Sequence, residues 1–155
     1  MSLSRRALPV LLAAPALAQG APRVVVIGGG FGGTSAARSL HAQGIAVTLV
    51  EARETYTACP LSNAVIAGLR PMGAQRFGYD GLRRAGVTVL HQAATSVEGR
   101  EVTLADGTRL PFDRLVLSPG IALRFDALPG YTEAASATMP HAWQAGAQTA
   151  LLARQ

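Results

Sequence analysis

Residues 24–33 read VVVIGGGFGG, and this stretch decides the fold. Four consecutive apolar residues before the glycines are typical of a strand buried on both faces of a parallel sheet. Gly28, Gly30 and Gly33 then follow the G-x-G-x-x-G spacing. In this spacing the first glycine permits a tight turn, the second lets the backbone approach a pyrophosphate, and the third lets a helix pack against the strand.

The residues after the glycines complete a strand-helix-strand unit. Residues 34–43 predict a helix that Gly44 ends, and residues 45–50 predict a second buried strand. A phosphate is favoured at the N-terminus of such a helix, where unpaired N–H groups and the helix dipole attract negative charge. We therefore predict that the turn binds a dinucleotide. Its cofactor-binding residues are predicted to be Gly28, Gly30, Phe31, Gly32 and Gly33.

Glu51 ends the second strand, about twenty residues after the glycines, and is placed to accept the ribose hydroxyls of an adenosine. This carboxylate favours an unphosphorylated ribose, which admits FAD and NAD and disfavours NADP. Downstream, Asp106-Gly107 predicts a tight hairpin, and a strand at residues 114–117 leads to Gly120. A Rossmann half interrupted by a β-meander resembles the FAD domain of flavoproteins with two dinucleotide-binding domains. The expected fold class is α/β.

The first 18 of the 155 residues predict a cleaved export signal. Arg5-Arg6 precedes an apolar run at residues 7–17, and small residues lie just before Gln19. The arrangement resembles a twin-arginine signal, whose pathway carries folded proteins; an ordinary secretory signal is the alternative. The run is too short to span about 30 Å of hydrocarbon, so no transmembrane segment is expected. The predicted location is the periplasm.

The formal charge of +5 includes two arginines of that signal, and no dense basic run with interleaved aromatic residues occurs. Nucleic-acid binding is therefore not expected. Cys59 is the only cysteine, and it lies in the long loop after the second strand. A lone thiol is unusual in an exported protein. It is either a small buried apolar residue or a thiolate bonded to another group. No residue pattern supports a metal site.

Three further segments carry a family resemblance: YTACPLSNAVIAG at residues 56–68, GYDGL at 78–82 and PHAW at 140–143. They resemble the flavoprotein subunit of flavocytochrome c sulfide dehydrogenases. In that family the cysteine of the matching loop is joined to the 8α-methyl group of FAD by a thioether. The resemblance thus implies a covalent 8α-S-cysteinyl FAD at Cys59. It also implies cofactor contacts at Arg53, Ala94 and Gly120, whereas His141 and Trp143 are expected to serve packing.

The same resemblance implies a sulfide:cytochrome c oxidoreductase that works with a c-type cytochrome subunit. The family uses a redox-active cysteine pair, which is expected beyond Gln155 together with a second domain. We therefore expect residues 19–140 to be the N-terminal part of an FAD domain and residues 141–155 to begin a linker. The chain alone is expected to be incomplete and inactive. The alternatives are a quinone reductase or NADH dehydrogenase, a noncatalytic nucleotide-binding fragment, or half of a split protein.

Overall fold

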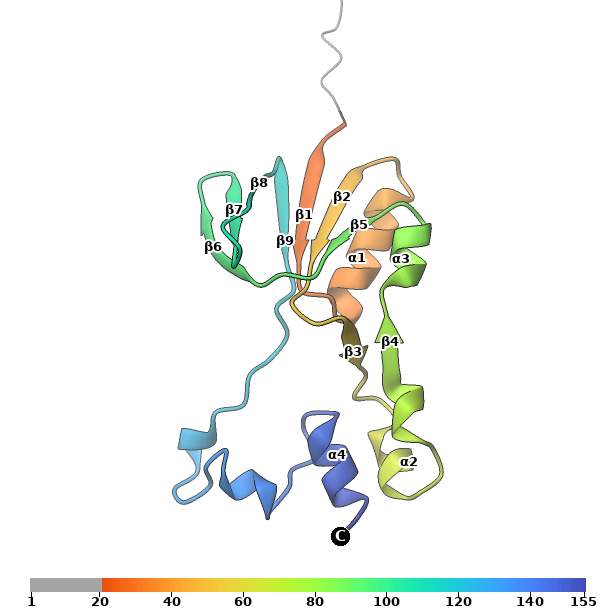
Figure 1. The fold of residues 1–155 in the computed structure, drawn as a ribbon, viewed down its shortest axis with the longest axis vertical. Helices are drawn as coiled ribbons and strands as arrows, with labels where there is room; N and C mark the ends of the chain where they lie inside the picture. Colours follow the sequence, from red (N-terminus) through yellow and green to blue (C-terminus); the bar gives the residue numbers. More distant parts are fainter. Residues whose placement is uncertain (1–20) are drawn as a thin grey trace, which may run out of the picture.

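The computed structural model describes residues 21–155 (Figure 1). The predicted export signal at residues 1–18 lies outside the described residues. Four parallel strands form the central sheet in the order β5-β2-β1-β9. Their bounds are Arg23–Ile27 for β1, Ala46–Val50 for β2, Thr88–Leu90 for β5 and Arg114–Leu117 for β9. The predicted α/β fold with a parallel sheet is confirmed.

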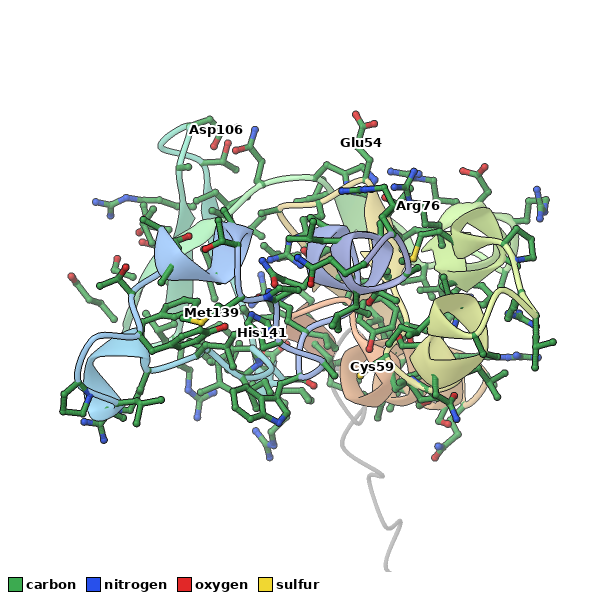
Figure 2. The ribbon with its side chains drawn as sticks, turned by 90° about the horizontal axis from the view of Figure 1, so that it is seen from below. Glu54, Cys59, Arg76, Asp106, Met139 and His141 are labelled. Carbon is green, nitrogen blue, oxygen red and sulfur yellow. The ribbon has the colours of Figure 1, made fainter. Side chains whose placement is uncertain are left out.

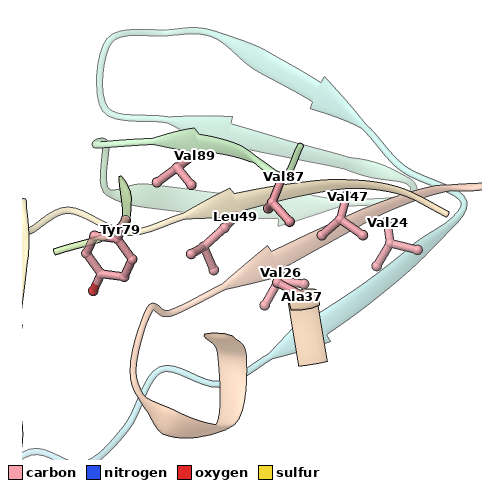
Figure 3. Close-up of a cluster of buried hydrophobic side chains, with 8 residues drawn as sticks. All are labelled: Val24, Val26, Ala37, Val47, Leu49, Tyr79, Val87 and Val89. Atoms are coloured by element: carbon pink, nitrogen blue, oxygen red, sulfur yellow. The ribbon is translucent and has the colours of Figure 1, made fainter. Parts of the chain in front are cut away.

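Helix α1 (Phe31–His41) connects β1 to β2 and covers one face of the sheet. It begins earlier than predicted because Phe31, Gly32 and Gly33 form its first turn. Valine and leucine side chains of the sheet pack against Ala37, which is fully buried (Figure 3). Burying each such side chain stabilises the fold by about 1.5–3 kcal/mol. This core holds the glycine turn at a fixed position relative to β1.

The opposite face of the sheet is covered by an antiparallel meander of β6 (Ala94–Glu98), β7 (Glu101–Leu104) and β8 (Arg109–Pro111). The predicted hairpin between β7 and β8 is confirmed. Strand β6 was not predicted, because its side chains are mostly exposed and give no apolar alternation.

The long loop after β2 is more regular than predicted. It contains β3 (Thr55–Thr57), α2 (Ser62–Ile66), the 3-10 helix η1 (Met72–Gln75) and β4 (Arg76–Gly78), and β3 pairs with β4 in antiparallel register. Helix α3 (Asp80–Arg84) then leads to β5. From the sequence we expect an irregular loop at residues 53–72 with one helical turn near residues 63–69. Helix α2 confirms the turn in part, whereas β3 shows that the rest is not wholly irregular. Strands of three residues, such as β3 and β4, carry no readable periodicity.

The C-terminal segment contains η2 (Phe125–Ala127), η3 (Ala135–Ala137) and α4 (Ala147–Leu152). From the sequence we expect a helix over residues 142–154, but α4 begins only at Ala147, because Gly146 before it has a φ of +126°. A helix cannot continue through this conformation. Helix α4 packs beside α2, away from the central sheet (Figure 1). Within residues 21–155, no helix has the length and apolar character needed to cross a membrane.

Candidate functional site: a dinucleotide-binding edge

The carboxyl ends of the four parallel strands meet at one edge of the sheet. The residues that follow these strands are Gly28, Glu51, His91 and Ser118. Backbone hydrogen bonds hold them together: Gly28 N–H donates to the Val50 carbonyl at 2.9 Å, and Ser118 N–H donates to the Ile27 carbonyl at 2.8 Å. Open α/β sheets bind ligands at such an edge.

The three glycines of the motif have different physical requirements. A Cβ on Gly28 would collide with the Ser118 carbonyl, and a Cβ on Gly33 would collide with the Gly28 carbonyl. These two glycines are needed for backbone packing. A Cβ on Gly30 would meet only the Tyr56 ring, at 3.5 Å, which is an ordinary contact. The protein itself therefore does not require glycine at position 30, whereas a pyrophosphate lying against the backbone does.

The N-terminus of α1 suits an anion. Gly30 precedes the helix without a side-chain cap, and the first turn contains no acidic residue. The amide N–H groups of the first turn therefore face outward without a capping side chain, and the helix dipole adds to their positive field. The arrangement fits the pyrophosphate of FAD.

Glu51 is oriented by two backbone N–H groups. Its Oε2 accepts a hydrogen bond from Gly29 N–H at 2.7 Å, and its Oε1 accepts one from Arg53 N–H at 3.0 Å. A carboxylate offers about four acceptor positions, so capacity remains for ribose hydroxyls. Arg53 reaches Glu51 through its backbone and its side chain is exposed. Its predicted contact with the ribose stays a prediction.

Tyr79 belongs to this site, although sequence reasoning missed it. Its hydroxyl donates to the Gly29 carbonyl at 3.0 Å, and its side chain is only 4% exposed. Burial, and then the nearby Glu51 charge, raise the pKa of Tyr79 to about 12. Its ring lies 5.5 Å from that of His91, whose Nδ1 is 3.3 Å from the Glu51 carbonyl. The only sequence signal was an aromatic residue in GYDGL, 50 positions from Gly29.

Cys59 lies between β3 and α2, and its side chain is labelled in Figure 2. It is exposed, so the interpretation of this cysteine as a buried apolar residue is wrong. Gln75 fixes the loop on both sides of it: the Gln75 carbonyl accepts from Ala58 N–H, and Gln75 Nε2 donates to the Pro60 carbonyl, each at 2.8 Å. Gln75 is 2% exposed and was also missed. The thiol is thus exposed, and hydrogen bonds from Gln75 fix the backbone on both sides of it.

The remaining predicted residues lie further from the glycine turn in the chain. Ala94 begins β6 and is half-buried, while Gly120 is exposed with a φ of +82°. Their predicted cofactor contacts stay predictions. His141 is buried as expected, whereas Trp143, which was also expected to pack, is 68% exposed. The Trp143 ring stacks on His141, and its carbonyl lies 4.0 Å from Cys59 Sγ.

Residues 22–149 match the family described as pyridine nucleotide-disulphide oxidoreductase. The chain belongs to this family. The expected FAD-binding Rossmann-like fold is thereby confirmed, and FAD is the cofactor that the family supports. In the part of the chain that the structure describes, no cluster of His, Cys, Asp and Glu side chains could hold a metal ion.

Two similar proteins indicate which members of this family the chain resembles. The chain is 54% identical over 48 residues to a sulfide dehydrogenase [flavocytochrome c] flavoprotein chain from Chlorobaculum thiosulfatiphilum, covering 30% of this chain and 100% of that sequence. It is 31% identical over 116 residues to a probable ferredoxin reductase from Castellaniella defragrans, covering 70% of this chain and 28% of that protein. The resemblance to the sulfide dehydrogenase flavoprotein subunit is confirmed.

Among solved structures, sulfide:quinone oxidoreductase from Aquifex aeolicus superimposes with a TM-score of 0.63 at 27% identity. The match covers 68% of this chain and 26% of that one. The chain therefore spans about a quarter of the length of the larger relatives that it matches.

Proposed function

We propose that the chain is the FAD-binding part of a periplasmic sulfide:cytochrome c oxidoreductase. The observation that carries this proposal is the 54% identity to the flavoprotein chain of a flavocytochrome c sulfide dehydrogenase. The name of that relative makes a c-type cytochrome the proposed electron acceptor. Sulfide, or another small sulfur compound, is the proposed substrate. Residues 19–140 are proposed to contribute to the FAD domain and residues 141–155 to lead out of it.

Each part of the site has a proposed role. When bound, FAD supplies a ring that takes up an electron pair from a sulfur nucleophile. The first turn of α1 holds the pyrophosphate, with Gly30 leaving room for it. Glu51 holds the adenosine ribose through its free acceptor positions. Backbone groups of Ala94 and Gly120 are proposed to contact the adenine and the cofactor, as the family resemblance implies.

Cys59 is proposed to anchor FAD covalently. The new bond between Cys59 Sγ and the 8α carbon replaces one S–H and one C–H bond. The two protons would be released, and FAD itself would take up the electron pair and be reoxidised by dioxygen or a cytochrome. Support comes from the exposure of the thiol and from the two hydrogen bonds that Gln75 makes beside it. A thioether would keep the cofactor from being lost outside the cytoplasmic membrane.

Covalent attachment is tested on the protein after denaturation in acid. We expect flavin fluorescence to co-migrate with the polypeptide on a denaturing gel, and we expect Cys59→Ala to remove it without removing the noncovalent FAD of the native protein. A yellow cofactor that washes away from the wild-type chain would contradict the thioether. A wild-type chain without any flavin would favour the noncatalytic-fragment alternative.

The electron acceptor is tested with the native protein purified from its own cells together with the polypeptides that co-purify with it, because the chain alone is expected to be inactive. We expect sulfide to reduce added cytochrome c and not ubiquinone. Reduction of the quinone alone would favour the quinone-reductase alternative, to which the structural match with a sulfide:quinone oxidoreductase points. Cell fractionation tests the location: the flavin-bearing band should be periplasmic, and replacing both Arg5 and Arg6 with lysine should retain it in the cytoplasm if the twin-arginine route is used.

A further inference from the structure

Gly29 is held at both of its backbone polar groups. Its N–H donates to Glu51 Oε2 at 2.7 Å, and its carbonyl accepts from the Tyr79 hydroxyl at 3.0 Å. Gly29 is not one of the three glycines that the G-x-G-x-x-G spacing requires. A Cβ at this position would collide with the Tyr79 hydroxyl and would come within 2.8 Å of Glu51 Cγ. The need for a glycine here comes from the two side chains packed against it.

The Tyr79 hydrogen bond sets the direction of the next N–H group. A peptide unit is planar and trans, so its N–H points opposite to its carbonyl. Because the Gly29 carbonyl points to Tyr79, the Gly30 N–H of the same peptide unit points away from Tyr79. Among residues 21–155 no protein group accepts a hydrogen bond from this Gly30 N–H. It is therefore a donor available for a phosphate oxygen.

Tyr79 is itself held rigidly. It joins β4 to α3, and its ring is part of the buried cluster that contains Leu49 and Val89 (Figure 3). A buried side chain that packs on several sides has few alternative rotamers, so its hydroxyl position is fixed by the core. The Gly29 carbonyl would lose this partner if the hydroxyl were removed, and an unpaired buried carbonyl is unfavourable.

We propose that Tyr79 is a positioning residue for the dinucleotide: it fixes the Gly29–Gly30 peptide unit so that the Gly30 N–H faces the pyrophosphate, while Glu51 faces the ribose. The proposal rests on the FAD site described above. It assigns to the β4–α3 connection a role in cofactor binding that the glycine motif does not contain. Because the effect passes through Gly29, Tyr79 need not touch the cofactor.

The test uses the full chain with Cys59→Ala, so that FAD binds reversibly, with and without Tyr79→Phe. Phenylalanine keeps the ring and removes only the hydroxyl. Dissociation constants are measured for FAD by fluorescence quenching and for ADP by competition. We expect Tyr79→Phe to weaken both ligands by about tenfold, the equivalent of about 1.4 kcal/mol, and to shift the ³¹P resonances of bound ADP.

The matched control is Tyr131→Phe, which removes a hydrogen bond of the same kind: the Tyr131 hydroxyl donates to the Met139 carbonyl at 2.7 Å. We expect this variant to bind FAD and ADP as tightly as its parent, with unchanged ³¹P resonances. A purely structural role for Tyr79 would lower the urea midpoint of unfolding without shifting those resonances. If Tyr79→Phe does not fold, Gly29→Ala tests the same peptide unit. Its Cβ meets both the Tyr79 hydroxyl and Glu51 Cγ, so this variant should weaken FAD and ADP and should shift the ³¹P resonances of bound ADP more than Glu51→Gln does.

The outcomes separate the two proposals. Equal affinity of the Tyr79→Phe variant and its parent for FAD and ADP would overturn the role of Tyr79 and leave the FAD site intact. A loss for FAD that ADP does not share would also overturn it, because both ligands carry the pyrophosphate. Absence of FAD and ADP binding by the Cys59→Ala parent itself would overturn the FAD site, and the role of Tyr79 with it.

Discussion

Glu51 Oε2 accepts a hydrogen bond from the Gly29 N–H at 2.7 Å, across 22 positions of the chain. The contact joins the residue expected to bind ribose to the turn expected to bind pyrophosphate. It exists because β1 and β2 are adjacent and parallel, with Ile27 paired to Val50. The residues that follow these two strands are consequently neighbours. A displacement of the Glu51 carboxylate would therefore break a hydrogen bond of the glycine turn.

Replacing Glu51 with glutamine should weaken FAD binding by about tenfold to a hundredfold, because hydrogen bonds to a charged acceptor contribute about 1.5–3 kcal/mol. Glutamine keeps the size of the side chain and removes its charge. The measurement is a fluorescence titration of FAD in the Cys59→Ala background. Glu54→Gln is the control, because Glu54 is an exposed glutamate of the same segment (Figure 2). Equal effects of the two substitutions would contradict the ribose role.

The substitution Gly30→Ala should weaken FAD binding while leaving the stability of the fold almost unchanged. Gly30 has φ −72° and ψ −170°, which alanine can adopt, and a Cβ there meets only an ordinary contact. We expect the urea midpoint of Gly30→Ala to stay close to wild type, while FAD affinity falls by at least about tenfold because the methyl group occupies the pyrophosphate position. Gly33→Ala should instead lower stability strongly, since its Cβ would collide with the Gly28 carbonyl. Unchanged FAD affinity in Gly30→Ala would place the pyrophosphate elsewhere.

Gln75→Ala should slow covalent flavin attachment without changing the initial noncovalent binding. The substitution removes the hydrogen bond to the Pro60 carbonyl and frees the backbone beside Cys59. The rate is followed as gel-stable flavin fluorescence after FAD is added to the apoprotein. Gln43→Ala provides the comparison, because Gln43 Nε2 donates to the Ser39 carbonyl at 3.1 Å on α1, far along the chain from the thiol. Attachment at the wild-type rate in Gln75→Ala would count against a role for this residue.

Stability should fall as the pH rises from about 10 to about 12. Tyr79 has its pKa raised to about 12, mainly by burial and then by the Glu51 charge. An unfolded tyrosine ionises near 10, so in this interval the unfolded chain has lost a proton that the folded chain keeps. The contribution of Tyr79 is therefore fully present below pH 10 and is lost as the pH approaches 12. Phenolate absorbance should show an ionisation step near pH 12, and Tyr79→Phe should abolish that step. A titration in which all tyrosines ionise together would refute this assignment.

The sequence by itself determined the strand-turn-helix unit, the place of Glu51 at the end of β2 and the hairpin of the meander. These features are local: a run of apolar residues, a glycine spacing or an Asp-Gly turn acts over a few consecutive positions, so it can be read without knowing the fold. The family resemblance of residues 56–68 likewise pointed to the right group of proteins. The sequence did not predict strands β3, β4 and β6, because they are short or exposed and are stabilised by their partner strands.

Only the tertiary structure decided that Tyr79 and Gln75 support the site. Tyr79 reaches Gly29 from 50 positions away, and Gln75 holds the backbone on both sides of Cys59 from 15 or more positions away. Neither pairing leaves a periodic pattern in the chain, because it depends on how β4 and η1 pack against β3 and the end of the sheet. The sequence therefore predicted where a dinucleotide should bind, and the packing of distant segments decided which side chains hydrogen-bond to the residues of that predicted site.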